Sequence, residues 1–178
     1  MAMTIEELSG ILTRLDIKHS FDRDSDIVLT WQTENFRATS GIYEVSPGET
    51  YDGLVMHMRL VHDNTMFVLN AQDAFDIKGA PHLDAFLKMC SLIQMRGYLI
   101  QFEYVPTRGT VGACIELPLM DNKLTAAQVK FCLDSIRSAL ESFYHPLQKA
   151  LKTGVLEGLP QEWLAAMASN EGGETSVI

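Results

Sequence analysis

The sequence predicts an α+β fold in which about five antiparallel strands form one sheet, packed on one face by three helices. Residues 98–119 have the pattern of a β-hairpin around Arg108-Gly109, with one apolar and one mixed face. Residues 54–73 repeat this division around Asp63-Asn64, so both hairpins can join one sheet with a common buried face. Amphipathic helical patterns before and after residues 98–119 supply the cover. The predicted element order is α-β-β-β-α-β-β-α.

Length and composition indicate one globular domain. The 178 residues are 47% hydrophobic and 21% charged, as in an ordinary soluble protein with a substantial core. We expect the domain to span residues 1–154 and a partly disordered extension to follow over 155–178. The 23 acidic residues outnumber the 14 basic ones, giving a net charge of −9. Because phosphate backbones bind clustered Lys and Arg, this balance argues against nucleic acid as a partner.

The three cysteines indicate a reducing compartment. Cys90, Cys114 and Cys132 have no close spacing, and each lies in an apolar pattern. Buried reduced thiols fit this arrangement better than disulfides. The first residues show no basic region followed by an apolar run, and no window offers about 18 uninterrupted apolar residues. We therefore expect a cytoplasmic protein that is neither exported nor membrane-spanning.

The N-terminal third begins with a helix and continues into strands. Thr4 and Glu7 have the spacing of a capping box, and the apolar spacing that follows predicts a helix to about Lys18. A polar turn over 21–25 precedes a β-branched and aromatic strand over Ile27–Trp31. A further short strand, interrupted at Gly41, is compatible with residues 36–45, and Pro47-Gly48 marks a turn.

The hairpin patterns assign side chains to faces. Around Asp63-Asn64, Leu60 lies opposite Phe67 on the apolar face, whereas His57 lies opposite Asn70 on the mixed face. Around Arg108-Gly109 the apolar pairs are Tyr104 with Ala113, Phe102 with Ile115 and Ile100 with Leu117, and the mixed pairs are Gln101 with Glu116 and Glu103 with Cys114.

Two further helices follow from apolar periodicity. The first spans residues 81–96, and Gly97 supplies its stop. The second spans residues 125–152, opens with a capping box from Thr125 and Gln128, and contains Pro146, which should kink or end it near Tyr144. A short helix over 160–167 and a disordered tail over 169–178 complete the prediction.

Candidate catalytic and metal-binding groups have ordinary structural explanations. His57 and His62 are five residues apart and point to opposite sides of a strand. His82 with Asp84, Cys114 beside Glu103, and Glu103 with Glu116 are conceivable acid-base, thiolate and carboxylate pairs. Polar residues are common at a helix start and on an exposed sheet face, and the chain has no phosphate-binding glycine motif. We therefore expect no catalytic residues, no cofactor and no metal.

The mixed face of the second hairpin is the candidate interaction surface. It is too apolar for a fully solvated surface and too polar for a core, and such faces often bind another chain. Its members are Val55, His57, Arg59, Val61, Met66 and Val68.

The order of elements resembles that of the YbjN-like proteins, regarded as candidate bacterial sensory transduction regulators, and of type III secretion chaperones. The similarity covers about residues 4–153. It comprises a strand ending in Asn70, a helix, a hairpin ending near Leu117-Pro118, and a final helix opened by the box at Thr125. It implies a non-enzymatic, cytosolic protein that binds other proteins, often as a dimer. The segment 33–51 and the residues beyond Gly154 are not part of the pattern.

We therefore predict a non-enzymatic protein-binding or regulatory module that forms a homodimer and engages a protein partner of unknown identity. Two alternatives remain open. One is a small-ligand binder or enzyme with a pocket between the sheet and the helix ends. The other is a chaperone for an exported or assembling protein.

Overall fold

A computed structural model describes residues 2–22, 26–31, 33–36, 53–95, 99–120 and 122–158. Within them lie three helices and one six-stranded antiparallel sheet with the strand order β1-β2-β3-β4-β6-β5. The elements are α1 (Ile5–Arg14), β1 (Ser20–Phe21), β2 (Ile27–Trp31), β3 (Leu54–Val61), β4 (Met66–Asp76), α2 (Leu83–Gln94), β5 (Gln101–Val105), β6 (Thr110–Pro118) and α3 (Ala126–Thr153).

The helix-covered α+β fold is confirmed, with six strands in place of about five. The extra strand is β1, which pairs with β2 and includes Phe21, the first residue of the predicted polar turn. Two residues are too few to show a period of two, so the pattern could not reveal this strand. The two hairpins meet through β4 and β6, whose residues Leu69 and Ile115 lie opposite each other.

The predicted register of the β3–β4 hairpin is confirmed. Leu60 lies opposite Phe67, and His57 lies opposite Asn70. Its connection spans residues 62–65, where His62, Asp63 and Asn64 all have positive φ. Asn and Asp tolerate this conformation better than most residues, which explains why the sequence located the turn correctly.

The predicted register of the β5–β6 hairpin is wrong by two residues. Tyr104 lies opposite Val111 instead of Ala113, because residues 106–109 form a four-residue connection instead of a two-residue loop at Arg108-Gly109. The Gly109 backbone N–H closes this turn by donating to the Val105 carbonyl at 2.9 Å, and Gly109 has a φ of 63°. A shift by an even number leaves every side chain on its predicted face.

Helices α1 and α3 begin at their predicted caps. Thr4 with Glu7 and Thr125 with Gln128 both form capping boxes. The first helix ends at Arg14, before the predicted Lys18, and Asp16 has a φ of 56°. The last helix runs through Pro146 to Thr153, so of the two predicted outcomes near Tyr144, a kink or an end, the end is wrong. Beyond the proline, the buried residues Leu147, Ala150 and Leu151 continue the apolar stripe, and their packing maintains the helix.

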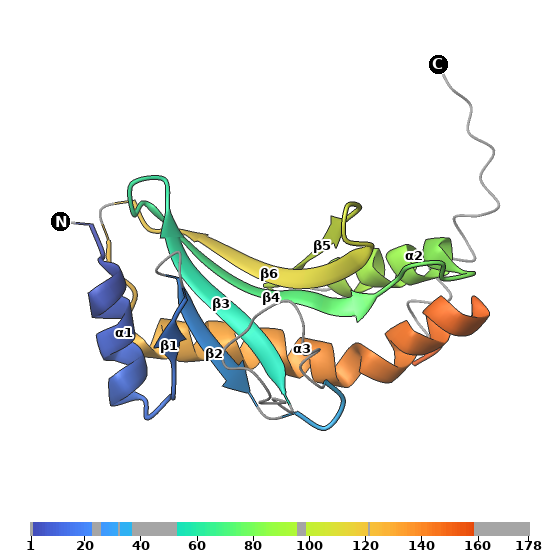
Figure 1. Cartoon of the computed structure of the whole chain (residues 1–178), viewed down its shortest axis with the longest axis horizontal. Helices are drawn as coiled ribbons and strands as arrows, with labels where there is room; N and C mark the ends of the chain where they lie inside the picture. Colours follow the sequence, from blue (N-terminus) through green and yellow to red (C-terminus); the bar gives the residue numbers. More distant parts are fainter. Residues whose placement is uncertain are drawn as a thin grey trace, which may run out of the picture.

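The core lies on one side of the sheet. Figure 1 shows α3 along the underside of the sheet, with α1 near its start and α2 near its end. One hydrophobic cluster joins the three helices to the strand residues that face them. Val28, Val68 and Cys114 are also buried, but they are not part of this cluster because they face the opposite way. We call the surface that carries them the outer face.

Several predictions concern residues outside the described ranges. These are the short strand beyond Phe36, the turn at Pro47-Gly48, the helix stop at Gly97, the helix over 160–167 and the disordered tail. Phe36 itself is buried and lies in no strand. The division of the chain at residue 154 stays a prediction, with α3 ending at a left-handed Gly154.

Candidate protein-binding face

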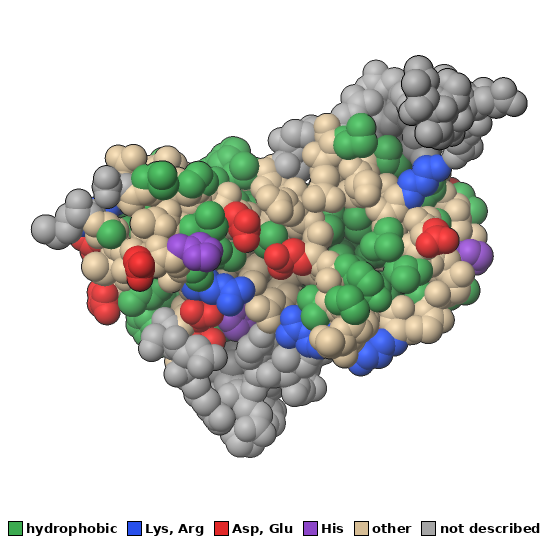
Figure 2. Space-filling model, turned by 90° about the horizontal axis from the view of Figure 1, so that it is seen from above, with side chains coloured by type: hydrophobic (Ala, Val, Ile, Leu, Met, Phe, Trp, Pro, Cys, Tyr) green, Lys and Arg blue, Asp and Glu red, His purple; other side chains and the backbone are tan. Residues whose placement is uncertain are grey.

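All six residues of the predicted interaction surface lie on the outer face of β3 and β4. Figure 2 views the molecule from the sheet side, where hydrophobic, acidic, basic and histidine side chains are interspersed. Four of the six residues are partly exposed, whereas His57 and Val68 are only 3% and 6% exposed. The partly exposed members are Val55, Arg59, Val61 and Met66.

A row of side chains crosses the middle of the outer face. Successive ladder partners along it are Val28, His57, Asn70, Cys114 and Gln101. His57 and Asn70 are buried polar residues outside the hydrophobic core. The alternation along β3 and β4 predicted which face His57 and Asn70 occupy. Their burial on that face also depends on side chains from other strands, and the sequence pattern did not predict those contacts.

Two further rows carry the charged and apolar parts of the face. In one, Arg59 and Glu116 lie on either side of Val68. In the next, Val61, Met66 and the exposed Pro118 are cross-strand neighbours near the end of the β3–β4 hairpin. Sequence reasoning missed Glu116 and Pro118 as members of this surface, because the pairing of β4 with β6 was not specified residue by residue.

A group of charged and polar residues lies where the β1–β2 turn meets β3. Asp22 Oδ2 is 3.8 Å from His57 Nδ1, and Asp26 Oδ2 is 4.0 Å from Arg59 Nη1. One donor atom from each of Asp22, Asp26 and His57 lies within 4.8 Å of the others, so these residues could hold a metal ion. Burial lowers the pKa of His57, opposed by Asp22 and reinforced by Arg59. The prediction that no metal-binding group exists did not consider these aspartates.

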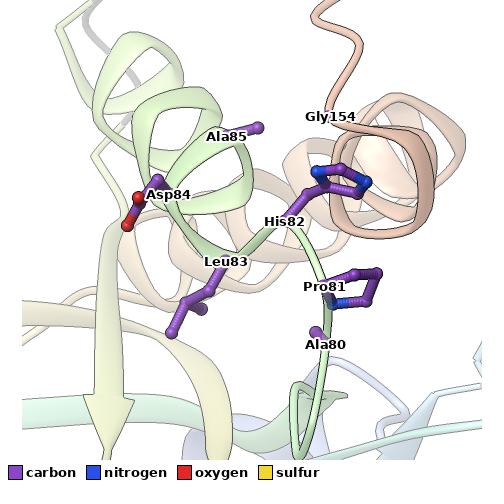
Figure 3. Close-up of a pocket in the computed structure, with 7 residues that line it drawn as sticks. All are labelled: Ala80, Pro81, His82, Leu83, Asp84, Ala85 and Gly154. Atoms are coloured by element: carbon purple, nitrogen blue, oxygen red, sulfur yellow. The ribbon is translucent and has the colours of Figure 1, made fainter.

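His82 and Asp84 do not form an acid-base pair. They line a hollow together with Ala80, Pro81, Leu83, Ala85 and Gly154. Figure 3 shows the His82 ring directed toward Gly154, while Asp84 points away on the other side of the helix start. A Cβ atom built on Gly154 would lie 2.9 Å from His82 Nδ1. The hollow therefore lies between the start of α2 and the end of α3, and none of its lining residues belongs to a strand, whereas the predicted pocket lay between the sheet and the helix ends.

Cys114 is a buried thiol whose charged neighbours among the described residues are mainly carboxylates. Its ladder partner is Gln101, so the predicted pairing with Glu103 is wrong, although Glu103 still contacts it diagonally. Burial and then the negative charges of Glu103 and Glu116 raise the pKa of Cys114 to about 12. Glu103 lies opposite Gly112, four positions from Glu116 and about 13 Å along the strand.

Comparison with known proteins identifies the fold. No protein-family model matches the chain, and no curated protein matches its sequence. YbjN, described as a candidate transcription regulator from E. coli, matches with a TM-score of 0.57 and 13% identity over 82% of this chain and 94% of its own. A chain of the ExsC–ExsE complex matches with a TM-score of 0.54 and 14% identity over 87% of this chain and 100% of its own.

The chain thus has a YbjN-like, type III secretion chaperone-like fold, as its sequence pattern predicts. At these identities the similarity concerns the fold alone. One of the two neighbours is described as a candidate regulator and the other belongs to a protein–protein complex. Among the described residues, no helix combines the length and the apolar character needed to cross a bilayer.

Proposed function

We propose that this chain is a non-enzymatic protein-binding module that uses its outer face to form a homodimer. The observation that carries the proposal is the one-sided core: all three helices pack on the same face of the sheet. The other face presents partly exposed Val55, Val61 and Met66 beside charged residues. Partly apolar surfaces of this kind are typical of interfaces between protein chains.

The arrangement of charge on the outer face suits two copies of the chain. Arg59 and Glu116 lie symmetrically on either side of β4. A two-fold axis along β4 would therefore place Arg59 of one copy opposite Glu116 of the other, with Met66 facing its own counterpart. Two-fold interfaces use the same patch on both subunits, so a patch must be complementary to itself. This face meets that condition in charge and in apolar character.

A binding role is favoured over catalysis by the placement of the candidate catalytic groups that the sequence raised. His82 and Asp84 point in different directions, Glu103 and Glu116 are separated along the sheet, and Cys114 is held as a thiol. These placements account for each candidate pair that the sequence raised.

Sedimentation equilibrium of the full chain tests the homodimer. Wild-type protein should show a concentration-dependent dimer, and Val61→Lys should weaken it because a charge would enter the apolar row. Ser138→Lys adds the same charge at an exposed position of α3 and should leave the dimer unchanged. Glu116→Arg should also weaken it, and adding Arg59→Glu should restore it by exchanging the charges. A wild-type monomer at all concentrations would contradict the proposal.

A chaperone for an exported or assembling protein is the second candidate function. The observation that favours it is the structural similarity to a chain of the ExsC–ExsE complex. Co-expression with a candidate client would distinguish the two, because a chaperone should keep an otherwise insoluble client in solution. Under this alternative, Val61→Lys would release the client while the dimer persisted.

A further inference from the structure

The group formed by Asp22, Asp26 and His57 has a geometry that the proposed homodimer does not use. Two of its members belong to the turn between β1 and β2, and the third lies on β3. Two hydrogen bonds join Asp22 and Asp26: Asp22 N–H donates to the Asp26 carbonyl at 3.0 Å, and Asp26 N–H donates to Asp22 Oδ1 at 2.9 Å. Asp22 thus directs its second oxygen, Oδ2, toward β3.

His57 points into this group from a rigid position. Its side chain is 3% exposed, and its backbone pairs with Val28 on one side and Asn70 on the other. The 3.8 Å between His57 Nδ1 and Asp22 Oδ2 is too long for a hydrogen bond. It falls within the separation of about 3 to 4 Å that two ligands adopt around a shared zinc ion, each about 2.0–2.2 Å from the metal.

We propose that Asp22, Asp26 and His57 form a divalent transition-metal site, with Zn²⁺ as its probe. One imidazole nitrogen and two carboxylate oxygens are suitable ligands for this ion, and water completes the coordination. Small movements of the aspartate side chains would bring all three donors to bonding distance, because they already lie within 4.8 Å of one another. A bound ion would join the β1–β2 turn to β3 and so fix one edge of the outer face.

Arg59 is the group that opposes metal binding. Its Nη1 lies 4.0 Å from Asp26 Oδ2, so its positive charge competes with a cation for the same carboxylate. Removing this charge should therefore strengthen binding. If no metal bound at this place, removing the Arg59 charge would not change the affinity of the protein for added metal.

Isothermal titration of Zn²⁺ into chelator-treated full-length protein tests the site. We expect one ion per chain and a higher melting temperature with the metal. Asp22→Asn keeps the backbone contact but should weaken affinity at least about tenfold, as should His57→Gln. Asp63→Asn, in the β3–β4 turn, is the matched control and should bind like wild type. Arg59→Gln should bind more tightly.

Two results would overturn the metal site. The first is the absence of Zn²⁺ binding to folded wild-type protein. The second is binding that Asp22→Asn and His57→Gln leave unchanged, since the ion would then lie elsewhere. The titration is independent of the homodimer test, because sedimentation in the presence of chelator reports the oligomeric state without metal.

Discussion

The three cysteines are the residues whose reactivity depends most directly on their surroundings. Cys90 and Cys132 belong to the core, whereas Cys114 lies on the outer face, yet all three are at most 3% exposed. Burial raises the pKa of Cys90 to about 12, as it does for Cys114, and raises that of Cys132 as well. The predicted buried thiols are confirmed, and none resembles an activated nucleophile.

We predict that native protein reacts slowly with a thiol reagent at pH 8 and that all three thiols react at once after denaturation.

The unfolded thiol ionises near its ordinary pKa of 9.0, while folded Cys114 keeps its proton to about 12. The unfolded state therefore loses protons first, and stability should fall as the pH rises above 9. Cys114→Ala should show a shallower fall in melting temperature. Rapid labelling of native protein would contradict this account.

Single residues also show what the sequence could specify. His57 and Val68 were assigned to the correct face, because alternation along β3 and β4 is determined locally. Their burial was not predicted, since it depends on neighbours from other strands: Val28 and Asn70 beside His57, and Arg59 and Glu116 beside Val68. Asp22 was placed in a turn, but its approach to His57 joins residues 35 positions apart, and no local pattern reports such a contact.

At the scale of elements, the end of β4 explains the shifted register of the neighbouring hairpin. The β4–β6 pairing is irregular between Ala71 and Phe75, and Asp73 within this bulge has a φ of 53°. The Asp73 side chain is 7% exposed and lies 3.2 Å from Arg108 Nε, and it also accepts a hydrogen bond from the Thr110 hydroxyl. Arg108 thus forms an ion pair with a residue of the bulge. The prediction had placed Arg108 in a simple two-residue turn.

We predict that Arg108→Ala lowers the free energy of unfolding by about 1–2 kcal/mol, because it leaves the Asp73 carboxylate buried with one fewer partner. The partial exposure of Arg108, 37%, keeps the loss below that of a fully buried pair. Urea denaturation measures the difference. Lys130→Ala breaks the exposed pair with Asp134 and should cost no more than about 0.5 kcal/mol. Equal losses in the two variants would show that Arg108 does not support the bulge.

The helices were the most predictable elements because their signals are local. Both capping boxes place a hydroxyl and a carboxyl or amide group three residues apart, and both helices begin there. The path of α3 beyond Pro146 was less predictable. A proline removes one backbone donor, but whether the helix continues depends on the burial of Leu147 and Leu151 in the hydrophobic core.

At the scale of the whole molecule, the layered arrangement follows from two hairpins that each have one apolar side. Such hairpins need a cover, and the amphipathic helices provide it. This reasoning predicted the fold without any single diagnostic motif. It could not predict how the outer face is built, because the rows through His57 and through Val68 depend on the pairing of β4 with β6.

Because the core lies on one side of the sheet, two buried valines, Val111 and Val68, should contribute differently to stability. Val111 is 1% exposed and belongs to the core, while Val68 is 6% exposed and lies on the outer face between Arg59 and Glu116. Val111→Ala should leave a cavity among fixed neighbours and cost about 2–3 kcal/mol. Val68→Ala should cost about 1 kcal/mol or less, because flexible charged side chains can cover the space. Urea denaturation of both variants under dissociating conditions measures these losses. Equal losses would mean that the outer face carries a second packed layer, and a face already filled by its own chain could not bind a partner as we propose.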